Sequence, residues 1–180
     1  MGSLKGQLLV AGPSLLDPNF RRTVVLVGEH TDEGALGVVL NRASDATVED
    51  AVPELSPLLD EAELVHFGGP VQPSAIVVVA DFADPAQAGV LILDSVGFLP
   101  AEVDPDTIGV LRRARVFAGY AGWGPGQLDE ELDEGSWIVE PALTEDVFTR
   151  DPDELWSDVL RRKGGPFEVL AQMPPDPSAN

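Results

Sequence analysis

Residues 23–40, with the sequence TVVLVGEHTDEGALGVVL, contain two continuous aliphatic runs separated by a short polar segment. The runs are residues 23–27 and 36–40. Continuous aliphatic runs of this length are typical of strands that are buried on both faces of a sheet. The segment between them contains Thr31, Asp32 and Gly34, which supply turn chemistry. We therefore predict a hairpin of two buried strands.

Further strands are predicted on both sides of this hairpin. They cover residues 7–11, 63–67, 76–79, 90–93, 115–118 and 136–139. The runs 76–79 and 90–93 are joined by a segment that contains Asp and Pro, which predicts a second hairpin. The strand at 115–118 is followed by the glycine-rich segment 119–127, GYAGWGPGQ, which we interpret as a loop before a helix.

Helix starts are marked by Asp104-Pro105 and Asp151-Pro152, where a capping carboxylate precedes a first-turn proline. After Asp151, four apolar residues fall on one helical face, and Gly164 offers a C-cap. Shorter helices are predicted at 47–52 and 127–134. Paired strands without a regular βαβ alternation favour an α+β fold, or an irregular α/β fold with a mixed sheet, over a doubly wound parallel sheet.

The charge balance narrows the possible partners. The 180-residue chain has 31 Asp and Glu against 11 Lys and Arg, a formal net charge of -20. Because sequence-independent DNA affinity comes from Lys and Arg at the phosphates, we expect no direct nucleic-acid binding, and anionic membranes are disfavoured for the same reason. The absence of cysteine excludes disulfides, thiolate nucleophiles and thiolate metal sites. No signal peptide or membrane-length apolar run is visible, so we expect a cytoplasmic protein.

The two histidines are the candidates for base chemistry. His30 lies beside Glu29 at a predicted strand end, where a general base could stand exposed, with Glu29 or Asp17 to orient it. His66 alternates with apolar neighbours and is interpreted as a hydrogen-bonded strand residue. Neither has a second His at helical ligand spacing, so we predict no metal site and no cofactor. The glycine-rich segment 119–127 lacks the Lys and Ser or Thr of a phosphate loop, which favours a tight turn over phosphate binding.

Several short motifs follow one another along the chain. They are residues 17–24 (DPNFRRTV), 29–30 (EH), 34–37 (GALG), 41–42 (NR), 68–71 (GGPV), 119–123 (GYAGW), 126–128 (GQL) and Glu131, then Trp137, Phe148 and Trp156. In this order they resemble the YqgE/AlgH family of bacterial proteins, over about residues 6–173. The resemblance implies one compact domain there, in which a bent, bifurcated mixed sheet forms a pseudo-barrel flanked by helices. Residues 174–180 are then a flexible, Pro-rich tail.

The same resemblance implies little chemistry. Part of the family's name comes from a proposed role in alginate regulation, and the charge of this chain argues that a transcriptional role would be indirect. Many relatives carry a Leu-His pair on the strand after the Gly-Gly-Pro motif. This chain has residues 76–80, IVVVA, at that position, so an activity that uses that histidine is not expected here.

These observations favour a non-enzymatic binding or regulatory protein with an unknown protein or small-molecule partner. The predicted ligand-binding surface consists of Asp17, Phe20, Arg21, Arg22, His30, Asn41, Arg42, Gly68, Gly69 and Pro70. Arg and Asn side chains are fork-shaped donors suited to carboxylates and amides. The structural alternative is that the three arginines pair with neighbouring acids and hold a loop. The functional alternative is a small hydrolase or transferase that uses His30 as its general base.

Overall fold

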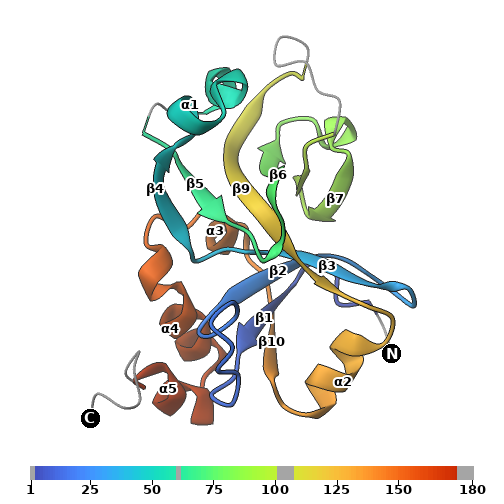
Figure 1. Cartoon of the computed structure of the whole chain (residues 1–180), viewed down its shortest axis with the longest axis vertical. Helices are drawn as coiled ribbons and strands as arrows, with labels where there is room; N and C mark the ends of the chain where they lie inside the picture. The colour runs from blue at the N-terminus through green and yellow to red at the C-terminus, as the bar shows by residue number, and fades with distance from the viewer. Residues whose placement is uncertain (1–2, 60–61, 101–107, 174–180) are drawn as a thin grey trace.

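The computed structural model describes residues 3–59, 62–100 and 108–173. Ten strands and seven helical segments follow one another along these residues (Figure 1). In chain order they are β1 (Gln7–Ala11), β2 (Val24–Thr31), β3 (Gly34–Val39), β4 (Ala43–Thr47), α1 (Val48–Ala51), the 3-10 helix η1 (Pro53–Leu58), β5 (Leu64–Phe67), β6 (Val71–Phe82), the 3-10 helix η2 (Pro85–Gln87), β7 (Val90–Leu93), β8 (Val96–Phe98), β9 (Leu111–Trp123), α2 (Gln127–Asp133), β10 (Trp137–Pro141), α3 (Thr144–Val147), α4 (Pro152–Lys163) and α5 (Pro166–Ala171).

The long strand β9 is where the sheet divides. Its last residues pair with β3, whereas its first two thirds pair with β6, so the strand order is β10-β1-β2-β3-β9-β6-β8-β7. The short strand β5 also joins β9, in the only parallel pairing among the described residues, and β4 pairs with β5. Figure 1 shows β9 curving between these two parts of the sheet. The predicted α+β class and the bent, bifurcated mixed sheet are confirmed, but the sheet is not closed into a barrel, because β10 and β7 at its two ends do not pair.

Both faces of the predicted central hairpin are buried, as the sequence indicates. One face of β1 and β2, which includes Leu8, belongs to the same apolar cluster as Trp156 of α4. The opposite face, which includes Leu9, belongs to the same cluster as Leu128 of α2. Figure 1 shows α4 and α2 on either side of these strands. A strand covered on both faces needs apolar residues at every position, which explains the continuous aliphatic run.

The second predicted hairpin is wrong. β6 pairs with β8 and β9, and β7 pairs with β8, so the runs 76–79 and 90–93 are not neighbours. β8 has only three residues and follows a turn in which Asp94 has a φ of 48°. A three-residue strand shows no usable periodicity, so the sequence pattern skips the strand that separates the other two.

The interpretation of residues 119–123 as a loop is also wrong, because these residues form the end of β9. Gly119 has a φ of 75° inside the strand, and a Cβ at this position would overlap the carbonyl oxygen of Gly69. A Cβ on Gly68 would in turn overlap the carbonyl oxygen of Gly119. The glycines of the two motifs therefore permit the link between β5 and β6 to cross β9 at backbone contact distance.

The predicted helices in the described residues are confirmed. α4 begins at Pro152 and ends before Gly164, whose φ is 80°, although the Asp151 side chain makes no capping hydrogen bond. α1 and α2 fall within the predicted ranges 47–52 and 127–134. The predicted helix start at Asp104 and the predicted tail 174–180 lie outside the described residues. No helix in the described part of the chain is long and apolar enough to span a membrane.

Candidate functional site

The predicted binding residues of the β1–β2 loop and the β3–β4 link lie together. The Asn41 side chain accepts a hydrogen bond from the Val24 N–H at 2.9 Å and donates one to the Arg22 carbonyl at 2.8 Å. Arg42 donates to the carbonyls of Asn19 at 2.7 Å and Arg21 at 3.0 Å. The Asn41 and Arg42 side chains therefore fix the loop to the sheet through hydrogen bonds to backbone groups.

Three further predicted residues make contacts within the fold. The Arg22 guanidinium lies 4.0 Å from the centre of the Trp156 ring and donates to the Met173 carbonyl at 2.9 Å. Phe20 packs edge-on against Trp137, with ring centroids 5.8 Å apart. The Asp17 side chain accepts from the Asn19 N–H at 2.9 Å, which closes the start of the loop. Each of these contacts holds the β1–β2 loop in place.

We call the hollow between this loop and the Gly-Gly-Pro segment the Gly-Gly-Pro groove. It has a volume of about 290 Å³ and is lined by Asn19, Val39, Arg42, Phe67, Gly69 and Pro70. Gly68 does not offer a free amide here, because its N–H donates to the Ala118 carbonyl at 2.9 Å. Phe67 is 54% exposed. The structure thus gathers Arg42, Gly69 and Pro70 at one groove, and the predicted binding role of the whole set stays a prediction.

His30 lies apart from the Gly-Gly-Pro groove, and the expected exposed base is wrong. Its side chain is only 9% exposed, and its Nδ1 accepts a hydrogen bond from the Leu4 N–H at 3.0 Å. The proton of the neutral ring is therefore on Nε2, which lies 3.7 Å from an Asp129 carboxylate oxygen. The neighbouring acid is thus Asp129, in place of the expected Glu29 or Asp17. With its lone pair already engaged, the ring has no free acceptor for a substrate proton.

His66 is a buried strand residue, as predicted. Its Nδ1 lies 3.2 Å from the Leu64 carbonyl, which can only accept, so Nδ1 carries the proton. Nε2 is buried without a hydrogen-bond partner among the described residues. Burial, the nearby positive charge of Arg115 and, in the opposite direction, the bond to Leu64 together lower the pKa of His66 to about 4. The ring is therefore neutral at physiological pH.

A second cluster of motif residues also has a structural explanation. The Glu131 carboxylate accepts hydrogen bonds from the indole N–H groups of Trp123 at 3.1 Å and Trp137 at 2.9 Å. The two indole rings meet edge-on, with centroids 6.1 Å apart. Because one carboxylate satisfies two indole donors, this arrangement ties α2 to β9 and β10.

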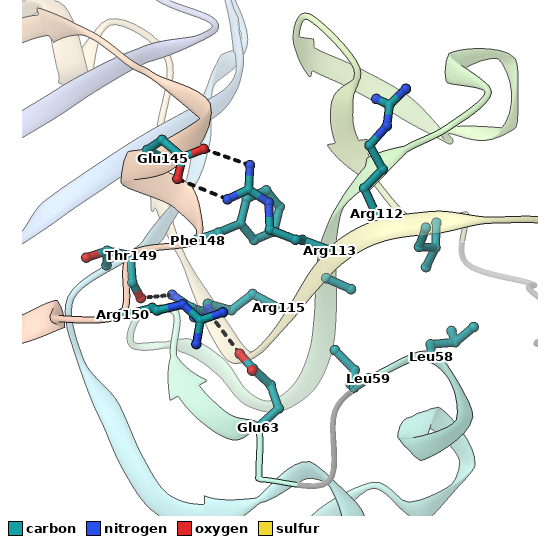
Figure 2. A pocket seen from close by; sticks show the side chains of 12 residues that line it. Leu58, Leu59, Glu63, Arg112, Arg113, Arg115, Glu145, Phe148, Thr149 and Arg150 are labelled. Atoms are coloured by element: carbon teal, nitrogen blue, oxygen red, sulfur yellow. Dashed lines mark hydrogen bonds and ion pairs between the residues drawn. The ribbon is translucent and has the colours of Figure 1, made fainter.

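Another polar hollow lies apart from the Gly-Gly-Pro groove, and we call it the arginine pocket. Its volume is about 470 Å³, and it is formed by β9, η1 with the residue after it, and the α3–α4 segment (Figure 2). The lining residues are Leu58, Leu59, Glu63, Leu111, Arg112, Arg113, Ala114, Arg115, Glu145, Phe148, Thr149 and Arg150. Because side chains alternate along a strand, Arg113 and Arg115 lie on one face of β9, and Figure 2 shows Arg112 pointing away from them.

Arg115 is a fixed part of the arginine pocket. Its side chain is buried, its Nε donates to Glu63 at 3.1 Å, and one terminal nitrogen donates to the Thr149 carbonyl at 2.6 Å. The same nitrogen lies 3.4 Å from the Val147 carbonyl. These contacts join β9 to the segment before β5 and to the α3–α4 link, so Arg115 has little freedom to rearrange around a ligand.

Arg113 and Arg150 are held less firmly. Arg113 makes a two-pronged contact with the exposed Glu145 carboxylate, with distances of 3.1 and 3.0 Å, and lies over the Phe148 ring. The bond and the charge of Glu145 raise the pKa of Arg113, and Arg113 lowers the pKa of Glu145. Arg150 is exposed and makes no hydrogen bond or ion pair within residues 3–59, 62–100 and 108–173. Within the described residues, the pocket therefore offers one unpaired cation, Arg150, beside Arg113, which the exposed Glu145 holds and which also lies 4.0 Å from a carboxylate oxygen of the buried Asp81.

The sequence carries a partial signal for this pocket. Arg112, Arg113 and Arg115 form a visible basic cluster, and strand alternation identifies the two that share a face. Glu145 and Arg150 lie 30 or more positions further along, and no motif links them to the cluster. In the described residues, no group of three or more His, Asp or Glu side chains is placed to hold a metal ion.

Comparisons with known proteins agree with this fold. The AlgH-like family matches residues 8–168. A UPF0301 protein of Streptomyces coelicolor is 42% identical over 187 residues, covering 100% of this chain and 97% of that protein. A UPF0301 protein of Thermobifida fusca is 43% identical over 190 residues, covering 99% and 96%.

Two solved structures are similar over nearly their whole length. The crystal structure of protein DIP2367 from Corynebacterium diphtheriae has a TM-score of 0.85 and 32% identity, covering 96% of this chain and 93% of that chain. The solution structure of the AlgH protein from Pseudomonas aeruginosa has a TM-score of 0.72 and 30% identity, covering 96% and 95%. The resemblance seen in the ordered motifs is thereby confirmed, and the chain belongs to the AlgH-like family.

Proposed function

We propose that this chain is a non-enzymatic binding protein whose ligand carries an anionic group that enters the arginine pocket. The observation that carries this proposal is the placement of charge. Of 11 Lys and Arg residues in a chain with a net charge of -20, four line one pocket, although Arg112 points away from Arg113 and Arg115 and pairs with Asp81 at 3.3 Å. Only two acids, Glu63 and Glu145, line it with them. A local excess of cations in an acidic protein supports a local anion ligand.

The volume of the arginine pocket supports a small-molecule ligand. Its volume of about 470 Å³ lies within the roughly 300–1,000 Å³ that small-molecule sites span. Acids that lie more than about 8 Å from the arginine pocket repel an anion in it only weakly, because physiological salt screens exposed charges beyond that distance. Guanidinium groups inside the pocket act at direct contact, where charge-assisted hydrogen bonds are strongest.

A regulatory role, if the protein has one, is proposed to act through this ligand or a partner protein and not through DNA. The net charge of -20 opposes a DNA surface. The cations of α4 support the same view: Arg161 pairs with Asp158, Arg162 pairs with Asp146, and Lys163 donates to the Val139 carbonyl. These groups stabilise the end of α4 and leave no phosphate-binding row along that helix.

Titration with inorganic phosphate, acetate and hexanoate, measured by calorimetry, tests the proposal. We expect binding of at least one of these anions, and Arg150→Ala should weaken it about 10-fold, since a hydrogen bond to a charged group contributes roughly 1.5–3 kcal/mol. Arg161→Ala is the matched control, because it removes the same charge from an exposed position outside the pocket. The proposal fails if none of the three anions binds, or if the two variants weaken binding equally.

A further inference from the structure

The contact between Arg113 and Glu145 indicates what the ligand of the arginine pocket looks like. Two nitrogens of one guanidinium face two oxygens of one carboxylate, at 3.1 and 3.0 Å. This fork-to-fork arrangement matches two parallel donors to the two oxygens of a planar acceptor. Arg113 is thus already oriented to receive a carboxylate, and the carboxylate that it holds belongs to the protein itself.

Glu145 can leave this position without unfolding its helix. Its side chain is 78% exposed, so it remains in water after it rotates away from Arg113. The backbone of α3 is held by the next residue: Asp146 is buried, accepts from the Leu143 N–H at 2.8 Å and pairs with Arg162 at 2.8 Å. Because exposed ion pairs contribute little to stability, release of Glu145 from Arg113 costs little free energy.

The surroundings of Arg113 favour a ligand with an apolar body. The Phe148 ring lies beneath its guanidinium, 4.8 Å from ring centroid to the central carbon. Leu58 and Leu59 project from the opposite side of the pocket in Figure 2, and Leu111 is the next residue on the same face of β9. Arg150, exposed and unpaired among the described residues, adds positive charge near the entrance. Apolar walls beside an ion-binding end are the usual composition of a small-molecule site.

We infer that Glu145 is an internal competitor, and that the arginine pocket binds a carboxylic acid with an apolar body whose carboxylate displaces Glu145 from Arg113. The inference rests on the proposed function, since it names the ligand class and the regulation of the same pocket. It assigns Glu145 a role opposite to that of a ligand-binding residue. Removal of Glu145 should therefore strengthen binding, whereas removal of a true contact residue weakens it.

The test compares hexanoate binding to the wild-type chain, Glu145→Ala and Glu145→Gln by calorimetry. We expect both variants to bind about 3- to 5-fold tighter, the upper part of the range of about 1.4- to 5-fold that the loss of one exposed ion pair allows. Glu168→Ala is the matched control, because it removes one exposed acid from α5, outside the pocket, and should change affinity less than 2-fold. Pentylphosphonate, with the same five-carbon apolar chain, should bind more weakly than hexanoate.

The outcomes separate the inference from the proposed function. If the wild-type chain binds hexanoate and the Glu145 variants bind it equally or more weakly, the displacement inference is wrong while the anion site stands. If Glu168→Ala gains as much affinity as Glu145→Ala, the gain is only net charge and the inference is again wrong. Tighter binding of pentylphosphonate than of hexanoate would overturn the carboxylate assignment. If neither the wild-type chain nor any variant binds an anion, the proposed function itself fails.

Discussion

Gly119→Ala is expected to destabilise the chain by about 2–5 kcal/mol. A residue with a side chain costs about 1–2 kcal/mol at a left-handed backbone conformation, and Gly119 has a φ of 75°. The new Cβ would also overlap the Gly69 carbonyl oxygen, where the β5–β6 link crosses β9. Overpacking at such a contact adds roughly 1–3 kcal/mol. Urea unfolding followed by tryptophan fluorescence measures the loss.

Gly122→Ala is the control for this substitution. It lies three residues further along the same strand, and a Cβ there would meet its nearest neighbours at 3.6 and 3.8 Å, ordinary contact distances. We therefore expect a change below about 1 kcal/mol in the free energy of unfolding. Equal effects of the two substitutions would show that the crossing of the two glycine motifs does not constrain the strand.

Arg115→Ala should cost about 3–5 kcal/mol, because it breaks a buried ion pair and leaves Glu63 and two carbonyls without their donor. The matched control is Arg161→Ala on α4, whose side chain is 51% exposed and whose partner Asp158 is 59% exposed, so its loss should cost less than about 1 kcal/mol. Thermal and urea unfolding of both variants gives the comparison. A loss below 1 kcal/mol for Arg115→Ala would contradict its role as a fixed wall of the pocket.

Arg115→Ala should also change how the stability of the chain depends on acid pH. In the wild type, burial and then Arg115 hold the pKa of His66 at about 4, below its ordinary value of 6.5. Between these values the unfolded chain binds a proton that the folded chain does not, so stability falls as the pH is lowered from about 6.5 to about 4, by at most about 3 kcal/mol. Without Arg115 the pKa of His66 should rise, and this loss should become smaller. NMR titration of the His66 ring protons tests this directly.

The central strands and helix α4 can be predicted from the sequence for physical reasons. A strand covered by helices on both faces has apolar residues at every position, and residues 23–27 show this directly. α4 is equally readable, because Pro152 and Gly164 mark its ends. The sequence does not indicate β8, because three residues carry no period, and at residues 119–123 it does not distinguish a turn from a close strand crossing, because glycines suit both.

The candidate site was less predictable. The ordered motifs lead to Arg42 and Gly69, which line one groove, but the side chains of Asn41 and Arg42 donate to backbone carbonyls within the fold. The arginine pocket depends on Arg113 meeting Glu145 across 32 positions, a pairing that only the tertiary structure provides. Local spacing can place two arginines on one face of a strand, but it does not show which element covers that face.

The most direct measurement of the central claim follows the arginine Nε–H resonances of the wild-type chain by NMR as hexanoate is added. We predict that the resonances of Arg113 and Arg150 shift with the same saturation curve, while those of Arg22 and Arg42, which hold the β1–β2 loop, stay in place. Shifts at Arg22 and Arg42 without any at Arg113 and Arg150 would contradict the account and place anion binding at the Gly-Gly-Pro groove instead.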